Sequence, residues 1–316
     1  MTTPVAIIGG RGYAGATFLD LLHGHPKLEL ALASSSSRWG QTLESVAPEW
    51  KGSSRTFETL EPGQVGEVDA GVWILALPNG LSDPWVQALN RAHPDAVIVD
   101  LGADYRFDSE WFYGLPELTR QSRGEARLIS NPGCYATGAQ LALAPVAESL
   151  QGLPVLFAVS GYSGAGRTPS PRNDPERLAQ NLIPYSLTGH LHEREVGHHL
   201  GREVRFSPHV AQFFRGISIT VAAEFADPVE PSDLLDRFAA AFDGEPLVGV
   251  QAEVPEIREV RETPHTLIGG FQVDARDPRR AHWVVVLDNL LKGAASQALQ
   301  NVNLALGLDE TLGVLP

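Results

Sequence analysis

The sequence predicts an α/β protein of two domains: a doubly wound parallel sheet, followed by a second α+β domain with a mixed or antiparallel sheet. Three observations lead to this prediction. Short apolar strands alternate with helical segments as far as residue 133. Longer strands of alternating polarity, separated by fewer helices, follow in the second half. A glycine-rich turn joins the first strand to the first helix, as at the start of many doubly wound folds.

In the first half, predicted strands and helices take turns. Residues 4–9 (PVAIIG) are a short apolar run that ends in glycine, typical of a strand buried in a parallel sheet. Residues 13–25 predict a helix with an apolar face, and residues 28–34 predict the next strand. The alternation continues with a strand at 71–78, a helix at 82–93 and a strand at 96–102. Parallel strands joined by helices need right-handed crossovers, which produce a doubly wound sheet.

The second half has a different pattern. Residues 217–225 (ISITVAAEF) alternate in polarity, as a strand with one buried face does. Residues 231–244 predict a helix with Pro231 near its start and Gly244 just past its end. Other predicted strands lie at 155–161, 271–275 and 282–288, and a final helix lies at 289–308. The expected domains are residues 1–133 and residues 134–289, with a C-terminal helix at about 290–316 packed on the first.

The charge and composition exclude several classes of protein. The chain carries 24 Lys and Arg against 38 Asp and Glu, a net charge of −14. Nucleic acids and anionic membranes need a basic face, so neither is an expected partner. No apolar run approaches the roughly 18 residues of a membrane span, and the first residues lack the basic flank of a signal peptide. A single cysteine cannot form an internal disulfide, so we expect a cytoplasmic protein.

The segment GGRGYAG (9–15) has the strand–turn–helix context of a phosphate-binding site. The backbone N–H groups of such a turn and the positive end of the helix dipole point at the phosphates of a cofactor. Glycines also form ordinary tight turns, but the buried strand before and the amphipathic helix after favour the cofactor interpretation. The predicted cofactor contacts in this segment are Gly9, Arg11, Gly12, Tyr13, Ala14 and Gly15.

The end of the second predicted strand indicates which dinucleotide binds. An NAD site usually has Asp or Glu there, bound to the ribose 2′-hydroxyl. This sequence has ASSSSR instead, with Ser34, Ser35 and Arg38 as candidate contacts. Hydroxyl groups and a guanidinium suit a 2′-phosphate, which a carboxylate would repel. NADP(H) is therefore the predicted cofactor, and a polar surface loop is the alternative interpretation.

Cys134 is the only cysteine of the chain, and it follows Pro132 and Gly133 at the predicted start of a helix. The dipole at a helix N-terminus favours the thiolate, which is the nucleophilic form of the side chain. A lone cysteine is also commonly a small buried hydrophobe. The local sequence leaves both interpretations open.

Histidine and glutamate gather in GHLHEREVGHHLG (189–201). A metal site is not predicted, because no H-E-x-x-H occurs and His190 and His192 do not share a helix face. His192 and Glu195, three residues apart, can share one. A thiol enzyme needs a base near its sulfur, and either histidine can supply it. The alternative is a pair of surface histidines on a solvated helix.

Together these stretches resemble the N-acetyl-γ-glutamyl-phosphate reductases of arginine biosynthesis, in the semialdehyde dehydrogenase superfamily. The resemblance covers most of the chain, and the order of the cysteine, His-x-His-x-x-Glu and closing motifs is highly specific. It implies an NADP-binding Rossmann domain at 1–133, followed by an α+β domain at 134–289 for catalysis, substrate binding and dimerisation. The matching stretches are GGRGYAG, DLGADYRF (100–107), YGLPEL (113–118), SNPGCYAT (130–137), SGYSGAGR (160–167), HLHEREV (190–196), FSPHV with RGI (206–217) and DNLLKGAASQALQN (288–301).

The resemblance also implies an activity and roles for individual residues. It implies reduction of N-acetyl-γ-glutamyl phosphate by NADPH to N-acetylglutamate 5-semialdehyde through a thioester, in a homo-oligomer that is a dimer or tetramer. Cys134 is the implied nucleophile, His190 the acid/base, and Asn289 the contact to the nicotinamide amide. The implied substrate contacts are Arg106, Ser163, His192 and Glu195. Two residues depart from the family pattern, Asn79 in place of His and Ser296 in place of Gly, so the acyl group is less defined than the chemistry.

Three alternatives stay open. The first is a related reductase for N-acetyl-aminoadipyl phosphate in lysine biosynthesis, although a charge of −14 disfavours docking of an acidic carrier protein. The second is an aspartate-semialdehyde dehydrogenase, which the His-x-His-x-x-Glu stretch fits less well. The third is a non-catalytic NADP-binding redox sensor that uses Cys134. A sensor needs neither an acid/base nor a carboxylate clamp, so the histidine motif and Arg106 favour an enzyme.

Overall fold

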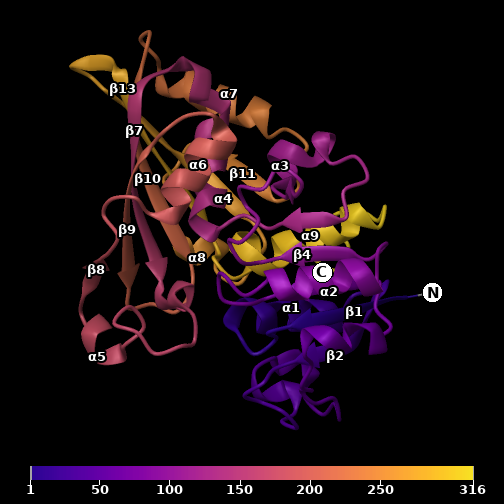
Figure 1. Ribbon diagram of the computed structural model, residues 1–316. Coiled ribbons are helices and arrows are strands. Elements are labelled where there is room, and N and C mark those ends of the chain that lie inside the picture. The colour runs from indigo at the N-terminus through magenta and orange to yellow at the C-terminus, as the bar shows by residue number, and fades with distance from the viewer. Residues whose placement is uncertain (1, 316) are drawn as a thin grey trace. The chain divides into compact units, whose positions relative to one another are not determined.

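The computed structural model describes residues 2–315 (Figure 1), which divide into two compact units. Unit 1 consists of Met1–Gly133 and Ala294–Pro316, and unit 2 of Cys134–Gly293. Each unit has its own sheet. Within the described residues, no helix combines the length and apolar character that crossing a membrane requires.

Unit 1 is built on a six-stranded parallel sheet in the order β2-β1-β3-β4-β6-β5. The two central strands are fully buried and, apart from Asp100, apolar, as expected for a sheet covered on both faces. Helix α9 packs against α1 and β4 of the same unit. The elements are β1 (Thr3–Ile8), α1 (Tyr13–His23), β2 (Leu28–Ser34), β3 (Val72–Leu75), α2 (Asp83–Ala92), β4 (Val97–Asp100), β5 (Phe112–Tyr113), α3 (Pro116–Thr119), β6 (Leu128–Ser130) and α9 (Ser296–Ala305).

Unit 2 contains a seven-stranded sheet in the order β11-β12-β13-β10-β7-β9-β8. Its pairs are antiparallel except β7 with β9 and β11 with β12, which makes the sheet mixed. Its strands are β7 (Leu150–Gly161), β8 (Leu182–Pro184), β9 (Arg205–Ala211), β10 (Ile217–Phe225), β11 (Val248–Gln251), β12 (Thr266–Asp274) and β13 (Asp277–Leu287). Its helices are α4 (Cys134–Leu143), α5 (Pro175–Leu178), α6 (Leu191–Leu200), α7 (Pro231–Ala241) and α8 (Ile257–Val260). The predicted fold class, a doubly wound sheet plus an α+β domain, is confirmed.

Helix α4 is fixed on the sheet of unit 2 by close packing. It contacts β10 and β13. A Cβ added at Gly138 would lie 2.7 Å from Leu287 Cδ2 and 3.0 Å from Ile219 Cδ1, so glycine allows the helix to approach the sheet. The Trp283 indole N–H donates to the carbonyl of Ala142 at 2.8 Å. The first residue of α4, Cys134, is thereby held on a rigid element.

The predicted final helix at 289–308 is two elements. Residues Leu291–Ala295 form a π-helical turn, and α9 begins only at Ser296. The Asp288 carboxylate accepts the backbone N–H groups of Leu290 at 2.9 Å and Leu291 at 3.1 Å, which fixes the start of the turn. The border between the units falls inside this segment, after Gly293.

Candidate active site

The glycine-rich turn of unit 1 has the geometry of a phosphate cradle. Gly9 has a φ of +83°, and an added Cβ would lie 2.4 Å from the carbonyl oxygen of Ala76. A Cβ on Gly15 would come within 3.0 Å of the Gly9 oxygen. At Gly12, among the described residues, an added Cβ would meet only the Gly9 oxygen, at 3.6 Å. Two glycines therefore close the turn onto the sheet, and the third leaves space beside the start of α1.

The start of α1 suits an anion. Within the described residues it has no side-chain cap and no acidic residue in its first turn. The first backbone N–H groups of a helix have no acceptor inside the helix, and the dipole there is positive. A phosphate group satisfies both conditions.

The end of β2 carries the residues predicted to select NADP. The Ser34 carbonyl accepts the N–H groups of Gly9 at 3.2 Å and Gly10 at 3.1 Å, so the serine segment adjoins the glycine turn. Ser35 is buried, and its hydroxyl oxygen has no hydrogen-bond partner in the described part of the chain. Arg38 is half-buried and donates to Gln41 Oε1 at 2.9 Å. An unused buried hydroxyl and a nearby guanidinium fit a bound phosphate group.

Arg106 lies in unit 1 and is 6% exposed. Its Nε donates to the carbonyl of Asn131 at 2.9 Å and its Nη2 to the carbonyl of Leu101 at 3.1 Å. Asn79 Oδ1 accepts the N–H of Ala103 at 3.1 Å, which ties the two loops at this edge of the sheet together. The residue predicted to bind substrate is thus anchored by backbone carbonyls of its own unit.

The same edge of the sheet holds a buried carboxyl group, Asp100, at the end of β4. Its Oδ1 accepts the Ser82 hydroxyl at 2.8 Å, while its Oδ2 has no hydrogen-bond partner among residues 2–315. Burial raises the pKa of Asp100 to about 6, against the lowering effect of the hydrogen bonds from Ser82 and Gly102. Asp100 therefore titrates close to neutral pH.

Replacing Asp100 with asparagine is expected to remove a pH dependence of stability. A carboxyl group whose pKa is raised in the folded chain contributes stability that is complete below its unfolded pKa, near 3.8, and is lost as the pH rises through about 6. The stability of Asp100→Asn relative to the wild type should therefore increase from pH 4 to pH 7, by roughly 3 kcal/mol. Thermal unfolding across this range measures the difference. The exposed Asp95→Asn variant is the control, and an equal slope for both variants would contradict the assignment.

In unit 2, Cys134 is the first residue of α4 and is partly buried. A Cβ added at Gly293 would lie 2.7 Å from the Cβ of Cys134, so this glycine fixes the position of the thiol. Cys134 lies in the wall of a pocket of unit 2. The pocket is lined by Cys134, Tyr135, Ser160, Gly161, Gly164, Ala165, Arg172, Tyr185, His192 and Val210.

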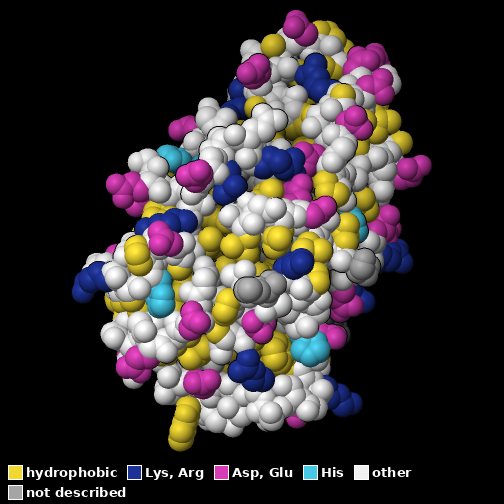
Figure 2. All heavy atoms as spheres, turned by 90° about the vertical axis from the view of Figure 1, so that its right-hand side faces the viewer, with side chains coloured by type: hydrophobic (Ala, Val, Ile, Leu, Met, Phe, Trp, Pro, Cys, Tyr) yellow, Lys and Arg dark blue, Asp and Glu magenta, His cyan; other side chains and the backbone are white. Residues whose placement is uncertain are grey.

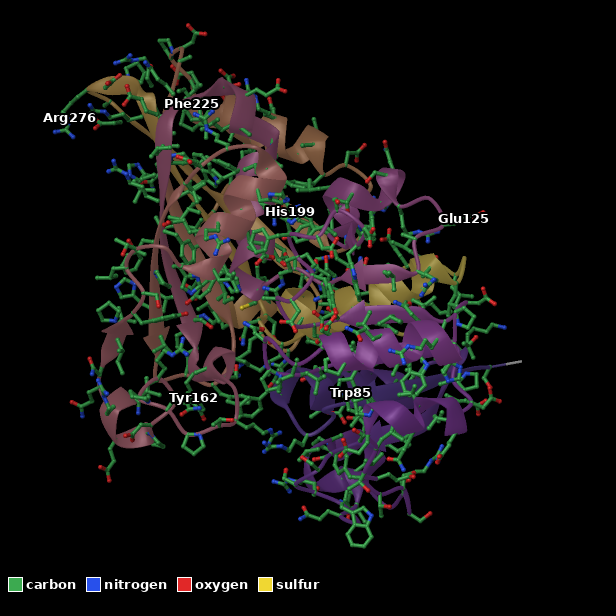
Figure 3. All side chains as sticks on the ribbon, in the orientation of Figure 1. Trp85, Glu125, Tyr162, His199, Phe225 and Arg276 are labelled. Atoms are coloured by element: carbon green, nitrogen blue, oxygen red, sulfur yellow. The ribbon has the colours of Figure 1, made fainter. Side chains whose placement is uncertain are left out.

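Figure 3 labels Tyr162 in the turn that follows β7 and His199 on α6. Helix α6 begins with the two predicted histidines. His190 caps the helix, and its Nδ1 accepts the backbone N–H of His192 at 3.1 Å. The two imidazole rings lie 4.9 Å apart, and the ring of Tyr135 contacts both edge-on. His192 also lines the pocket that contains Cys134.

The environment of His190 changes its acid–base behaviour. Burial, followed by the positive charge of Arg172, lowers the pKa of His190 to about 4, and Glu195 opposes this shift. Glu195 is fully buried on α6. His190 is therefore neutral at pH 7, with Nδ1 as an acceptor, and not in the imidazolium form that acts as a general acid.

Two tyrosines and an arginine in the pocket wall were not among the predicted site residues. Burial, followed by the charge of Cys134, raises the pKa of Tyr185 to about 12. Burial is also the main cause that raises the pKa of Tyr135, whose hydroxyl donates to the carbonyl of His209 at 2.7 Å. Both phenols are therefore hydrogen-bond donors at neutral pH. Arg172 lies over the ring of Tyr185, with 4.8 Å from its Cζ to the ring centroid.

Ser163 and Asn289 form a buried brace in unit 2. Asn289 Nδ2 donates to Ser163 Oγ at 2.8 Å, and Asn289 Oδ1 accepts the N–H of Gly216 at 2.7 Å. The adjacent Asp288 makes a two-point ion pair with Arg215, at 2.6 and 2.9 Å. Asn289 therefore holds the turn after β7 in place, and its predicted contact to nicotinamide stays a prediction.

The described residues contain no group of three or more His, Cys, Asp or Glu side chains placed to hold a metal ion. On the face shown in Figure 2, Lys and Arg side chains are interspersed with Asp and Glu rather than gathered in one patch. The site is thus a thiol pocket with imidazole, phenol and guanidinium groups in unit 2, and a phosphate cradle in unit 1.

Comparisons with known proteins agree with this fold. The fold is similar to that of aspartate semialdehyde dehydrogenase II from Vibrio cholerae, with a TM-score of 0.75 and 19% identity over 97% of this chain and 99% of that one. It is also similar to aspartate semialdehyde dehydrogenase with NADP from Candida albicans, with a TM-score of 0.71 and 16% identity over 99% of both chains. The family models for the semialdehyde dehydrogenase NAD binding domain and dimerisation domain match residues 4–126 and 134–289. These matches place the chain in the semialdehyde dehydrogenase class.

A closer relationship defines the family within that class. The N-acetyl-γ-glutamyl-phosphate reductase of Stenotrophomonas maltophilia is 49% identical over 313 residues, which cover 99% of this chain and 98% of that protein. The enzyme of the same name from Xylella fastidiosa is 47% identical over 313 residues, covering 99% and 93%. The chain belongs to the N-acetyl-γ-glutamyl-phosphate reductase family.

Proposed function

We propose that this protein reduces N-acetyl-γ-glutamyl phosphate to N-acetylglutamate 5-semialdehyde with NADPH, as a step of arginine biosynthesis. The observation that carries the proposal is the placement of the only thiol, Cys134, at the first residue of α4 in a pocket with His192, Tyr185 and Arg172. The names of the relatives supply the acyl group. The residues of the pocket supply the reaction class, which is acyl transfer to a thiol followed by reduction.

The first half of the reaction forms a thioester on Cys134. The thiolate adds to the carbonyl carbon of the acyl phosphate, and the bond from that carbon to the phosphate oxygen breaks. Phosphate leaves with the electron pair and takes one proton, for which His192 is the proposed donor. Backbone N–H groups at the start of α4 stabilise the oxyanion of the tetrahedral state, an effect worth about 3 kcal/mol per donor in other enzymes.

The second half releases the aldehyde. NADPH, when bound, supplies a hydride to the thioester carbonyl. The oxyanion that results collapses, the carbon–sulfur bond breaks, and Cys134 leaves as the thiolate that begins the next cycle. Covalent catalysis thus divides one difficult reduction into two easier steps. The phenols of Tyr135 and Tyr185 stay protonated throughout, because the pKa of each is raised.

The phosphate cradle of unit 1 is the proposed NADP site. Gly9, Gly12 and Gly15 would hold the pyrophosphate, with the backbone of Arg11, Tyr13 and Ala14 around it. Ser34, Ser35 and Arg38 would hold the 2′-phosphate. The open position beside Gly12 and the unused hydroxyl of Ser35 support this assignment.

Replacement of Arg38 by alanine is expected to weaken NADPH use selectively. A charge-assisted contact between guanidinium and phosphate contributes 1.5–3 kcal/mol, which corresponds to about a 10- to 100-fold loss of kcat/KM for NADPH. The value for NADH, which has no 2′-phosphate, should hardly change. Steady-state kinetics with both cofactors measure the ratio, and the exposed Lys51→Ala variant is the control. An unchanged ratio in Arg38→Ala would show that another residue selects the cofactor.

The proposed assembly is a homo-oligomer, a dimer or tetramer, in the cytoplasm. Strand β7 alternates buried Leu156 and Ala158 with exposed Val155 and Phe157, which are 39% and 43% exposed. Such an apolar strip is typical of a surface that another chain covers. Unit 2 would supply the contacts between subunits, and sedimentation equilibrium measures the assembled mass.

One assay tests the proposed function directly. In the oxidative direction, the protein should reduce NADP only when N-acetylglutamate 5-semialdehyde and inorganic phosphate are both present. The N-acetyl-aminoadipate homologue and aspartate semialdehyde should be poorer substrates. Efficient oxidation of either one in preference would assign the alternative reductase or dehydrogenase. No reaction with any aldehyde, together with reversible oxidation of Cys134, would favour the redox sensor.

A further inference from the structure

The loop that follows the turn after β7 is irregular but tightly bonded. Asn173 Nδ2 donates to the carbonyl of Gly166 at 2.7 Å and to that of Thr168 at 2.8 Å. Asn173 Oδ1 accepts the Ser170 N–H at 2.7 Å and lies 3.2 Å from the Ser170 hydroxyl. The amide of Asn173 therefore makes four polar contacts with other residues of the loop, which hold the loop closed. Arg172 is the residue immediately before it.

Arg172 is directed into the pocket of Cys134, whose wall it forms together with Tyr185. Its guanidinium lies over the face of the Tyr185 ring, with 4.8 Å from its Cζ to the ring centroid. Stacking occupies the flat face of a guanidinium and leaves the N–H groups along its edge available. The ring thus orients the charged group without neutralising it.

Arg172 also lacks an acidic partner in the part of the chain that the structure describes. Other arginines of unit 2 are paired, Arg215 with Asp288 and Arg276 with Asp274. The backbone N–H of Arg172 is held by Ser170 Oγ at 3.3 Å. In a chain with a net charge of −14, an oriented guanidinium with no carboxylate beside it is a site for an anion that comes from outside.

We propose that Arg172 binds the carboxylate at the end of the substrate remote from its acyl phosphate, and so selects N-acylated amino acids with a free α-carboxylate. This inference rests on the proposed function and deepens it. The acyl carbon must reach the partly buried Sγ of Cys134, so the opposite end of the substrate lies toward the exposed rim where Arg172 stands. The planar fork of a guanidinium matches the two oxygens of a carboxylate. Arg172 is thus a specificity residue rather than a catalytic one.

The test compares two substrates in two variants. N-acetylglutamate 5-semialdehyde and its α-methyl ester differ only in the carboxylate. In the wild type, the acid should have a KM about 10- to 100-fold lower than the ester, the usual scale for a charge-assisted contact. Arg172→Gln should raise the KM of the acid to that of the ester, with kcat and the KM of phosphate nearly unchanged. Arg172→Lys should restore only part of the preference. Arg177→Gln, on α5 and exposed, should behave as the wild type.

Two outcomes would overturn the inference. The first is an unchanged preference for the acid in Arg172→Gln. The second is a variant in which the KM of phosphate is raised while the KM of the aldehyde is unchanged. Protection of Cys134 from alkylation provides a readout that needs no turnover. N-acetyl-2-aminobutyrate should protect the wild type better than its amide does, and Arg172→Gln should abolish the difference. Failure of the wild type to oxidise any aldehyde would therefore refute the proposed function, while the protection assay still decides for or against Arg172.

Discussion

Replacement of Cys134 by serine is expected to abolish reductase activity, by roughly 10⁴-fold or more, while NADPH binds with nearly unchanged affinity. The hydroxyl of serine is far less nucleophilic than a thiolate at neutral pH, and its alkoxide is a much poorer leaving group than the thiolate when the acyl-enzyme is reduced. The cofactor site proposed here lies in unit 1, whereas Cys134 belongs to unit 2. Steady-state rates and a fluorescence titration with NADPH measure the two effects separately.

The control for this variant is its stability. Serine is close in size to cysteine, so thermal unfolding of Cys134→Ser should match that of the wild type. Activity within tenfold of the wild type in a folded variant would contradict covalent catalysis. Equal loss of activity and of NADPH affinity would point to a structural role for the thiol.

The histidine pair is expected to show unequal effects. His192→Asn should lower kcat by about a hundredfold or more, the usual loss when a general acid–base group is removed. His192 lines the pocket of Cys134, whereas His190 caps α6 with Nδ1 and has a pKa lowered to about 4 by burial and Arg172. His190→Asn keeps a side-chain acceptor at the helix start, so its effect on kcat should be smaller.

Each variant is the matched control for the other, because both substitutions replace a histidine by asparagine at the start of the same helix. Neither should change NADPH affinity. Rapid-quench trapping measures the rate at which the acyl-enzyme forms, and His192→Asn should slow this step because the leaving phosphate lacks its proton donor. The assignment of the acid/base to His190, taken from the order of residues in the motif, stays a prediction. The reverse ranking of the two variants would favour it.

Regular patterns in the sequence were sufficient to locate most of the fold. β2 and β10 begin and end at the predicted residues, 28–34 and 217–225, because a buried strand and a half-buried strand each have a distinct pattern. The short strands β5 and β8, of two and three residues, have no pattern of their own, and only their neighbours in the sheets define them. The π-helical turn before α9 has no pattern of its own, because residues 289–308 have the composition and periodicity of one continuous helix.

The candidate site was predictable where a motif fixes it and not elsewhere. Cys134, the histidines and the glycine turn stand in short local patterns. Arg172 and Tyr185 stand in a stretch without a motif, and only the pairing of β8 with β9 and the loop closed by Asn173 bring them to the pocket. The lowered pKa of His190 could not be predicted from the sequence either, because the burial of His190 and its proximity to Arg172 exist only in the folded chain.

A burst experiment without phosphate tests the central claim, a thioester on Cys134. When the protein is mixed with NADP and N-acetylglutamate 5-semialdehyde but no phosphate, NADPH should appear rapidly in an amount equal to the number of active chains and then almost stop. Mass spectrometry should find the acyl group on the peptide that contains Cys134, and addition of phosphate should restart turnover. Continuous turnover without phosphate, or no NADPH until phosphate is added, would contradict the account.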